Sequence, residues 1–205
     1  MSDPTLEQRR DFFDALYVSG EEVPWDRKGA PQPLVADWAA GHAVTGGGRR
    51  AMVIGCGLGG DAEFLAGLGF VTDAFDFAPA AIEAARRLNP ESVVEYAVAD
   101  LLDLPADRLG AYDLVLESMT VQSLPRSERP RVVAAVRSLV AAGGTLLVVS
   151  GQQGSWPDEP TGPWPLSRAD IDSFGADGLS LVRLEEPAGA DGRPRWRAEF
   201  TRAAD

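Results

Sequence analysis

The feature that most constrains the fold of this chain is an alternation of apolar runs with amphipathic segments between residues 49 and 150. The runs typical of buried β-strands cover residues 51–55, 71–77, 93–99, 112–118 and 145–150. The segments with helical periodicity cover residues 61–69, 79–88 and 127–144. Strands that alternate with helices form a parallel sheet with helices on both faces. The sequence therefore predicts an α/β fold with a doubly wound sheet.

The last quarter of the chain departs from this alternation. Residues 151–166 are rich in Pro, Gly and Trp, which is typical of a loop, and Ser167 can cap a short helix after it. Two strand-like runs, 179–186 and 195–202, then flank the turn sequence AGADG. We therefore expect a mostly parallel seven-stranded sheet that is closed by an antiparallel C-terminal hairpin.

The first 48 residues have a different character from the rest of the chain. Leu6, Phe12, Phe13 and Leu16 fall near helical spacing, and a proline-rich stretch separates them from a second predicted helix near residue 34. A chain of 205 residues makes one domain. Within it we expect an N-terminal helical cap or lid over residues 1–48 and a core over residues 49–205.

Composition excludes several classes of protein. With one cysteine and one histidine, the chain has neither a disulfide framework nor the ligands of a Cys/His zinc site, and we expect no metal. The net charge of −12 argues against nucleic acid and anionic membranes as partners. We expect no signal peptide, because the first residues lack a basic stretch followed by an apolar one, and no apolar run is long enough to span a membrane. We expect a cytoplasmic protein, a monomer or homodimer, whose partner is a small-molecule substrate.

The sequence GCGLGGD follows the first strand of the predicted core. Glycines there let the chain turn sharply and let a ligand approach the backbone. Gly55 and Gly57 fit the pattern G-x-G-x-x-G together with Gly60, and they fit G-x-G-x-G together with Gly59. Asp76 ends the second strand, and its carboxylate can accept hydrogen bonds from both ribose hydroxyls of an adenosine ligand. The loop alone leaves open whether that ligand is a dinucleotide.

Acidic residues also follow the third and fourth strands. Asp100 can accept a hydrogen bond from an adenine amino group, and Leu101 beside it can offer its backbone N–H. The fourth strand ends in Glu117, in the sequence YDLVLESMTVQSLP. With these residues at the strand ends, and with GCGLGG and Asp76 before them, residues 49–150 resemble the class I S-adenosylmethionine-dependent methyltransferases. The resemblance implies a Rossmann-like methyltransferase fold, S-adenosylmethionine as the cofactor, and methyl transfer as the reaction.

The resemblance also assigns roles to residues at the start of the core. Gly55, Gly57 and Gly59 would lie against the methionine part of the cofactor. Asp76 would hold the ribose hydroxyls, and Phe77 would lie on the face of the adenine.

The later strand ends carry the remaining roles. Asp100 and Leu101 would contact the adenine edge, and Glu117 and Ser118 would lie near the methionine part. The family often has an acidic residue two positions before the first glycine, where this sequence has Val53. This departure affects a contact that supports the loop and leaves the backbone contacts in place.

Both ends of the chain resemble a narrower group. Tyr17 and the sequence VPWDRKGAPQPLV are similar to the N-terminal cap of the tellurite-resistance, thiopurine and halide/thiol methyltransferases, in which a Pro-Trp-Asp segment folds over the cofactor. TGPWPLSRADIDSF resembles the loop and short helix after the fifth strand of that group. This similarity implies that Trp25 covers the cofactor and that Trp156 and Trp164 wall the substrate side.

The scarcity of acid–base residues bears on the mechanism. In-line displacement on a sulfonium mainly requires a nucleophile held at about 3–3.5 Å with its orbitals aligned. A thiol, another soft nucleophile or an amine can react in this way without a strong general base. Glu117 is the candidate base, provided that burial raises the pKa of its carboxyl group.

Three alternatives compete with methylation of a small molecule. Methylation of DNA or RNA conflicts with the negative charge, and the fourth strand is followed by ESMT and not by the Asn-Pro-Pro-aromatic sequence of amino-adenine methylases. An NAD(P)-binding oxidoreductase would use the other glycine spacing, but Asp100 and the closing hairpin speak against it. A catalytically silent protein that binds S-adenosylmethionine stays open, because a fold and a cofactor site do not guarantee turnover.

Overall fold

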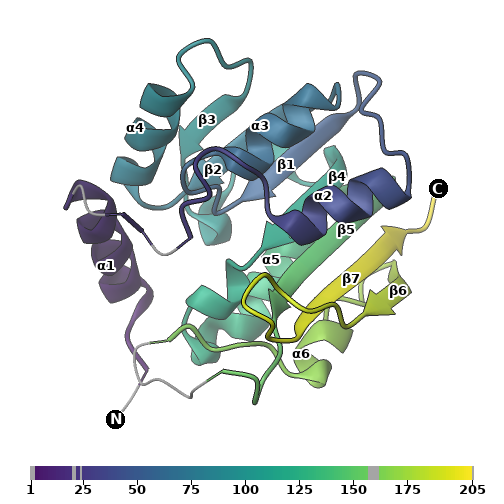
Figure 1. Cartoon of the computed structure of the whole chain (residues 1–205). Helices are drawn as coiled ribbons and strands as arrows, with labels where there is room; N and C mark the ends of the chain where they lie inside the picture. Colours follow the sequence, from purple (N-terminus) through teal and green to yellow (C-terminus); the bar gives the residue numbers. More distant parts are fainter. Residues whose placement is uncertain (1–2, 20–21, 24, 157–161, 205) are drawn as a thin grey trace.

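The computed structural model describes residues 3–19, 22–23, 25–156 and 162–204, which form a seven-stranded sheet with helices packed around it (Figure 1). The strands are β1 (Arg50–Ile54), β2 (Val71–Asp76), β3 (Glu95–Val98), β4 (Tyr112–Ser118), β5 (Val140–Gly151), β6 (Leu179–Glu185) and β7 (Arg195–Arg202). The helices are α1 (Leu6–Val18), α2 (Pro33–Gly41), α3 (Gly60–Gly67), α4 (Pro79–Leu88), α5 (Arg129–Ser138) and α6 (Arg168–Asp172). None of the helices in the described ranges is long and apolar enough to cross a membrane.

The sheet has the strand order β3-β2-β1-β4-β5-β7-β6. Strand β1 pairs in parallel with both β2 and β4, whereas β7 runs antiparallel to its neighbours β5 and β6. This topology confirms the predicted mostly parallel sheet and its antiparallel closing strands. The chain order reverses between β1 and β4, and open α/β sheets bind ligands beyond the carboxyl ends of the strands at such a point.

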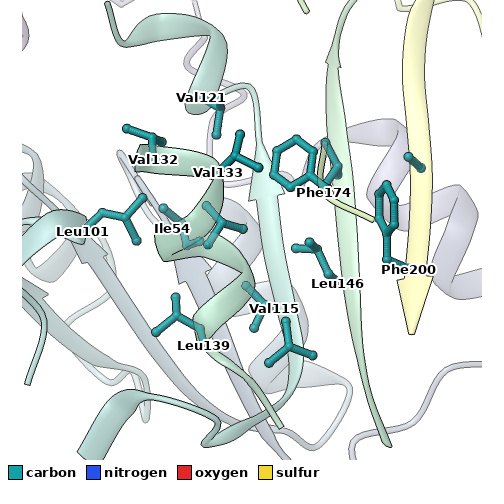
Figure 2. Packing of buried hydrophobic residues seen from close by; sticks show 14 of the residues in the cluster. Ile54, Leu101, Val115, Val121, Val132, Val133, Leu139, Leu146, Phe174 and Phe200 are labelled. Carbon is teal, nitrogen blue, oxygen red and sulfur yellow. The ribbon is translucent and has the colours of Figure 1, made fainter. Parts of the chain in front are cut away.

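Each face of the sheet buries its own hydrophobic core, because side chains alternate between the faces along every strand. One core packs Val115 of β4 and Leu146 of β5 against Val133 of α5 and Phe174, which follows α6 (Figure 2). The opposite core contains neighbouring residues of the same two strands, among them Leu147, with residues of α2, α3 and α4. Packing on both faces fixes the positions of the central strands, so the loops that follow these strands begin at well-defined places.

Strand β5 begins earlier than its apolar pattern predicts. The pattern places its start at residue 145, but the strand begins at Val140, and α5 ends at Ser138. Val140 pairs with Tyr112, and the register of the two strands shifts before the next pair, Leu114 and Thr145. The Gly-Gly pair ahead of residue 145 is therefore part of an irregular strand and not the end of a helix, and the predicted helix over 127–144 is too long.

The two helices of the predicted cap over residues 1–48 occupy different places. Helix α2 packs in the core, whereas α1 lies beside α4 at one end of the sheet (Figure 1). The Asp14 carboxylate of α1 accepts a hydrogen bond of 2.9 Å from the Ala80 backbone N–H in the first turn of α4. Ala78, at the N-cap of α4, has no side-chain oxygen, so Asp14 takes over the capping role from another helix. Pro24 of the Pro-Trp-Asp sequence lies outside the described residues.

Candidate functional site

The glycine-rich loop joins the end of β1 to the start of α3. The φ angles are 59° at Gly55, 52° at Gly57 and 90° at Gly59, all in the region that side chains disfavour. At Gly57 a Cβ atom would also lie 2.9 Å from the Tyr17 hydroxyl oxygen. The loop therefore makes the predicted sharp turn, and its middle glycine is faced by a side chain of α1.

Asp76 connects the end of β2 to this loop. One carboxylate oxygen accepts a hydrogen bond from the Gly57 N–H and the other accepts one from the Ala78 N–H, each at 3.0 Å. The side chain is buried, which raises the pKa of its carboxyl group, and the backbone donors act in the opposite direction. Each oxygen has a further lone pair, so the carboxylate that shapes the loop still has acceptor capacity for a ligand.

Aromatic side chains of the N-terminal segment gather over the loop. Phe13 of α1 contacts Trp25 with ring centroids 5.6 Å apart and Phe77 at 5.9 Å. Trp25 donates a hydrogen bond of 2.8 Å from its Nε1 to the hydroxyl oxygen of Tyr17. We call Phe13, Tyr17, Trp25 and Phe77 the aromatic cap. It brings the predicted residues Trp25 and Phe77 together through Phe13, for which the sequence indicated a helix but no role in the site.

The predicted adenine contacts lie after β3. Asp100 accepts a hydrogen bond of 2.9 Å from the Leu102 N–H through Oδ1, and its Oδ2 lies 3.4 Å from Arg10 of α1. Its side chain is 40% exposed, so the carboxylate is partly accessible from solvent. Leu101 buries its side chain in the core beside α5. Sequence reasoning missed Arg10, although it shares one face of α1 with Asp14 at helical spacing.

Glu117 ends β4 and is fully buried. Its Oε1 accepts hydrogen bonds of 2.8 Å from the backbone N–H groups of Thr120 and Val121, while Oε2 has no partner among the described residues. Burial raises the pKa of the Glu117 carboxyl group to about 7, against the two backbone donors and the charge of Arg129.

The neighbouring Ser118 faces a second buried carboxylate, that of Asp61 in the first turn of α3. Burial raises the pKa of the Asp61 carboxyl group, and the backbone N–H of Gln32 opposes this shift. The Gln32 N–H donates to Asp61 at 2.6 Å. Asp61 therefore ties the segment before α2 to the end of the glycine-rich loop, a contact that sequence reasoning missed.

The two tryptophans predicted for the substrate side lie in different surroundings. Trp164 is buried, and its ring centre lies 5.5 Å from the guanidinium carbon of Arg9, which also stacks at 4.6 Å on Phe13 of the aromatic cap. Trp156 instead packs under Arg195 at 4.9 Å, at the start of β7. The structure thus brings Trp164 next to the aromatic cap and places Trp156 at the closing hairpin.

Comparisons with known proteins bear on the fold and on the family of the core. Residues 51–144 match the family described as "Methyltransferase domain". The ubiquinone biosynthesis O-methyltransferase of Xanthomonas campestris pv. campestris (strain B100) is 33% identical over 132 residues, which cover 60% of this chain and 54% of that protein. The chain therefore spans about half the length of the curated relatives it matches.

Solved structures extend the likeness to nearly the whole chain. A structure described as "Conversion of a Disulfide Bond into a Thioacetal Group during Echinomycin Biosynthesis" has a TM-score of 0.77 at 25% identity, covering 95% of this chain and 92% of that one. The N-methyltransferase NodS from Bradyrhizobium japonicum WM9, solved with S-adenosyl-l-homocysteine, has a TM-score of 0.74 at 17% identity, covering 95% and 98%. Together the comparisons show a methyltransferase-like fold and a match of residues 51–144 to a methyltransferase domain, in agreement with the motifs. The likeness to the tellurite-resistance, thiopurine and halide/thiol group stays a prediction.

The geometry of Gly57 leads to a first prediction. Replacing it by alanine should lower the melting temperature and loosen the aromatic cap, because the new methyl group meets both an unfavourable φ and the Tyr17 hydroxyl. Gly47→Ala is the matched control, since Gly47 has a φ of 57° and a Cβ there would have no atom within 4 Å. Differential scanning calorimetry with tryptophan fluorescence should show the larger loss for Gly57→Ala. Equal losses would mean that Tyr17 does not contact the loop.

The burial of Glu117 predicts a pH dependence of stability. The folded state raises the pKa of this carboxyl group from 4.5 to about 7, so it binds more protons than the unfolded state between these values. The free energy of unfolding should therefore fall as the pH rises through this window, and Glu117→Gln should remove up to about 3 kcal/mol of that fall.

Urea unfolding at pH 4.5 and pH 8 checks this prediction, with the exposed Glu91→Gln as the control for loss of a charge. A stability difference between wild type and Glu117→Gln that stays constant with pH would contradict it.

Proposed function

We propose that this chain transfers a methyl group from S-adenosylmethionine to a small-molecule acceptor by in-line displacement. The observation that carries the proposal is the buried Asp76 carboxylate hydrogen-bonded to Gly57, under an aromatic cap, at the carboxyl ends of β1 and β2. The match of residues 51–144 to a methyltransferase domain supports it. The activity of the whole protein rests on this proposal, because the curated relatives are about twice as long as the matched region.

The residues around the glycine-rich loop suit this cofactor. Glycines without side chains leave the backbone open to the methionine part, and the acceptor capacity of Asp76 matches the two ribose hydroxyls. Phe77 offers a ring face to the adenine, and the partly exposed Asp100 carboxylate can accept a hydrogen bond from its amino group. The cofactor supplies an electrophilic methyl group on a positively charged sulfur.

The protein's own contribution is to orient the two reactants and to exclude water. Helix α1 and the aromatic cap cover the loop, and Trp164 is buried beside Arg9 next to the cap. We place the acceptor on this side of the cap. Trp156 would contact an acceptor only if that molecule reaches the closing hairpin.

We favour a thiol, another soft nucleophile or an amine as the acceptor. Glu117 has one oxygen held by two backbone donors, which leaves Oε2 as the atom that could take a proton. His42 follows α2, where its ring contacts the Trp38 carbonyl oxygen at 2.8 Å and approaches Glu199, away from the loop. Neither Glu117 nor His42 is placed as a strong general base beside the loop. A nucleophile that is already ionised, or whose lone pair is available without deprotonation, therefore reacts most readily. The cytoplasmic location and the monomer or homodimer stay predictions.

Ligand-dependent melting tests the cofactor. At about 100 times its Kd, S-adenosylhomocysteine should add about 2.7 kcal/mol to the free energy of unfolding, a rise of roughly 5–10 °C in melting temperature. NADH at the same concentration should give no rise. Asp76→Ala should weaken the binding of S-adenosylhomocysteine by about 10-fold or more, through loss of charge-assisted hydrogen bonds. Asp37→Ala, on α2, should bind as the wild type does, and a shift with NADH alone would overturn the proposal.

An acceptor panel tests the chemistry. Thiols, heteroaromatic amines and phenols would be incubated with S-adenosylmethionine, and the formation of S-adenosylhomocysteine would be measured for each. We expect turnover with thiols or amines at neutral pH, because these need the least help from a base. The Xanthomonas relatives are named as O-methyltransferases, so phenols are the informative competitor. Turnover with phenols alone would contradict the preference while leaving methyl transfer in place.

A further inference from the structure

The hydroxyl of Tyr17 lies directly on the glycine-rich loop. It would be 2.9 Å from a Cβ atom at Gly57, and the Nε1 of Trp25 would be 3.8 Å from the same point. Trp25 donates its N–H to the Tyr17 oxygen at 2.8 Å. An indole nitrogen can only donate, so the tyrosine oxygen is the acceptor in this bond and its own proton is not used there.

The other two hydroxyls that face glycines of this loop already donate to protein atoms. The Thr120 hydroxyl, which faces Gly55, donates to the Ile54 carbonyl oxygen at 3.0 Å. The Tyr96 hydroxyl, which faces Gly59, donates to the Glu63 carboxylate at 2.6 Å. Within the described ranges, the Tyr17 proton has no such acceptor. Of the hydroxyls that face the glycines of the loop, Tyr17 is therefore the one that can donate to a ligand.

Three backbone donors of the loop are also engaged. The Cys56 N–H donates to the Phe75 carbonyl oxygen and the Gly59 N–H to the Cys56 carbonyl oxygen, each at 2.9 Å. The Gly57 N–H donates to Asp76. An anionic group placed against these residues needs a donor from a side chain, because an anion left without donors in a buried site is costly.

The surroundings keep Tyr17 in its protonated form. Its side chain is buried, and burial together with the Asp76 carboxylate raises the pKa of the phenol far above neutral pH. Asp76 can only accept hydrogen bonds, whereas the neighbouring Tyr17 hydroxyl can donate one. The two side chains can therefore bind different parts of an amino-acid nucleoside: Asp76 accepts from the ribose hydroxyls, and Tyr17 donates to the carboxylate.

We propose that Tyr17, oriented by Trp25, donates its hydroxyl proton to the carboxylate of the cofactor's amino-acid part and so selects nucleosides that carry it. This inference rests on the proposed function. The ribose hydroxyls would donate to Asp76, so they are weaker candidates to accept a hydrogen bond from Tyr17. The ammonium group of the cofactor has no lone pair and cannot accept one.

The test compares two ligands that differ only in the amino-acid part. S-adenosylhomocysteine has the carboxylate, whereas 5′-deoxy-5′-methylthioadenosine keeps the adenosine and the thioether without it. Isothermal titration of both ligands into wild type and Tyr17→Phe gives the ratio of their Kd values. Tyr17→Phe should weaken S-adenosylhomocysteine about 10- to 100-fold and leave methylthioadenosine within about twofold. Tyr96→Phe is the matched control, because its hydroxyl faces the same loop but donates to Glu63, and the ratio should not change.

Each other outcome counts against the inference. Equal weakening of both ligands by Tyr17→Phe would show that the residue only packs the cap, and no weakening would show that it makes no contact. Wild type that binds the two ligands equally well would also overturn the inference, and this measurement is decisive even if the variant does not fold. That result would leave the proposed function standing, whereas wild type that binds neither ligand would overturn both.

Discussion

The hydrogen bonds of the buried Asp76 carboxylate are the interaction on which the site depends. A carboxylate that is 6% exposed has lost most of its water, and backbone donors at Gly57 and Ala78 replace it. Those donors are within reach because β1 and β2 pair in parallel with Ile54 level with Phe75. One side chain thus joins the turn at the glycines to the start of α4. A ligand that binds this carboxylate meets a site that the protein has already ordered.

Helix α1 completes the site from outside the sheet. Arg10, Asp14 and Tyr17 fall on one face of this helix, and they meet Asp100, the start of α4 and the glycine-rich loop. The exposed ion pair of Arg10 contributes little to stability by itself. The aromatic and buried contacts of α1 therefore do most to hold it in place. One short helix in this way spans the ends of three neighbouring strands.

The sequence was sufficient for the sheet and for the residues at the strand ends, and insufficient for contacts between distant segments. Strand alternation and the closing turn have local signals, and the carboxyl ends of parallel strands meet by topology, so Gly57 and Asp76 could be placed together in advance. The stacking of Phe13 on Phe77 depends on how α1 docks, which no local pattern encodes. The early start of β5 at Val140 was masked by the small residues that follow it. The position of Trp156 beside Arg195 likewise depends on a contact between distant segments.

The cap that Asp14 provides for α4 has a consequence for how the two helices move. The first N–H groups of a helix have no partner within it, and in α4 the Ala80 N–H is satisfied by a residue of another helix. If α1 lifted away, α4 would lose this acceptor, and its first turn would fray. Docking of the N-terminal helix and order at the start of α4 are therefore thermodynamically linked. The rate of hydrogen exchange at the Ala80 amide therefore reports whether α1 is docked against α4.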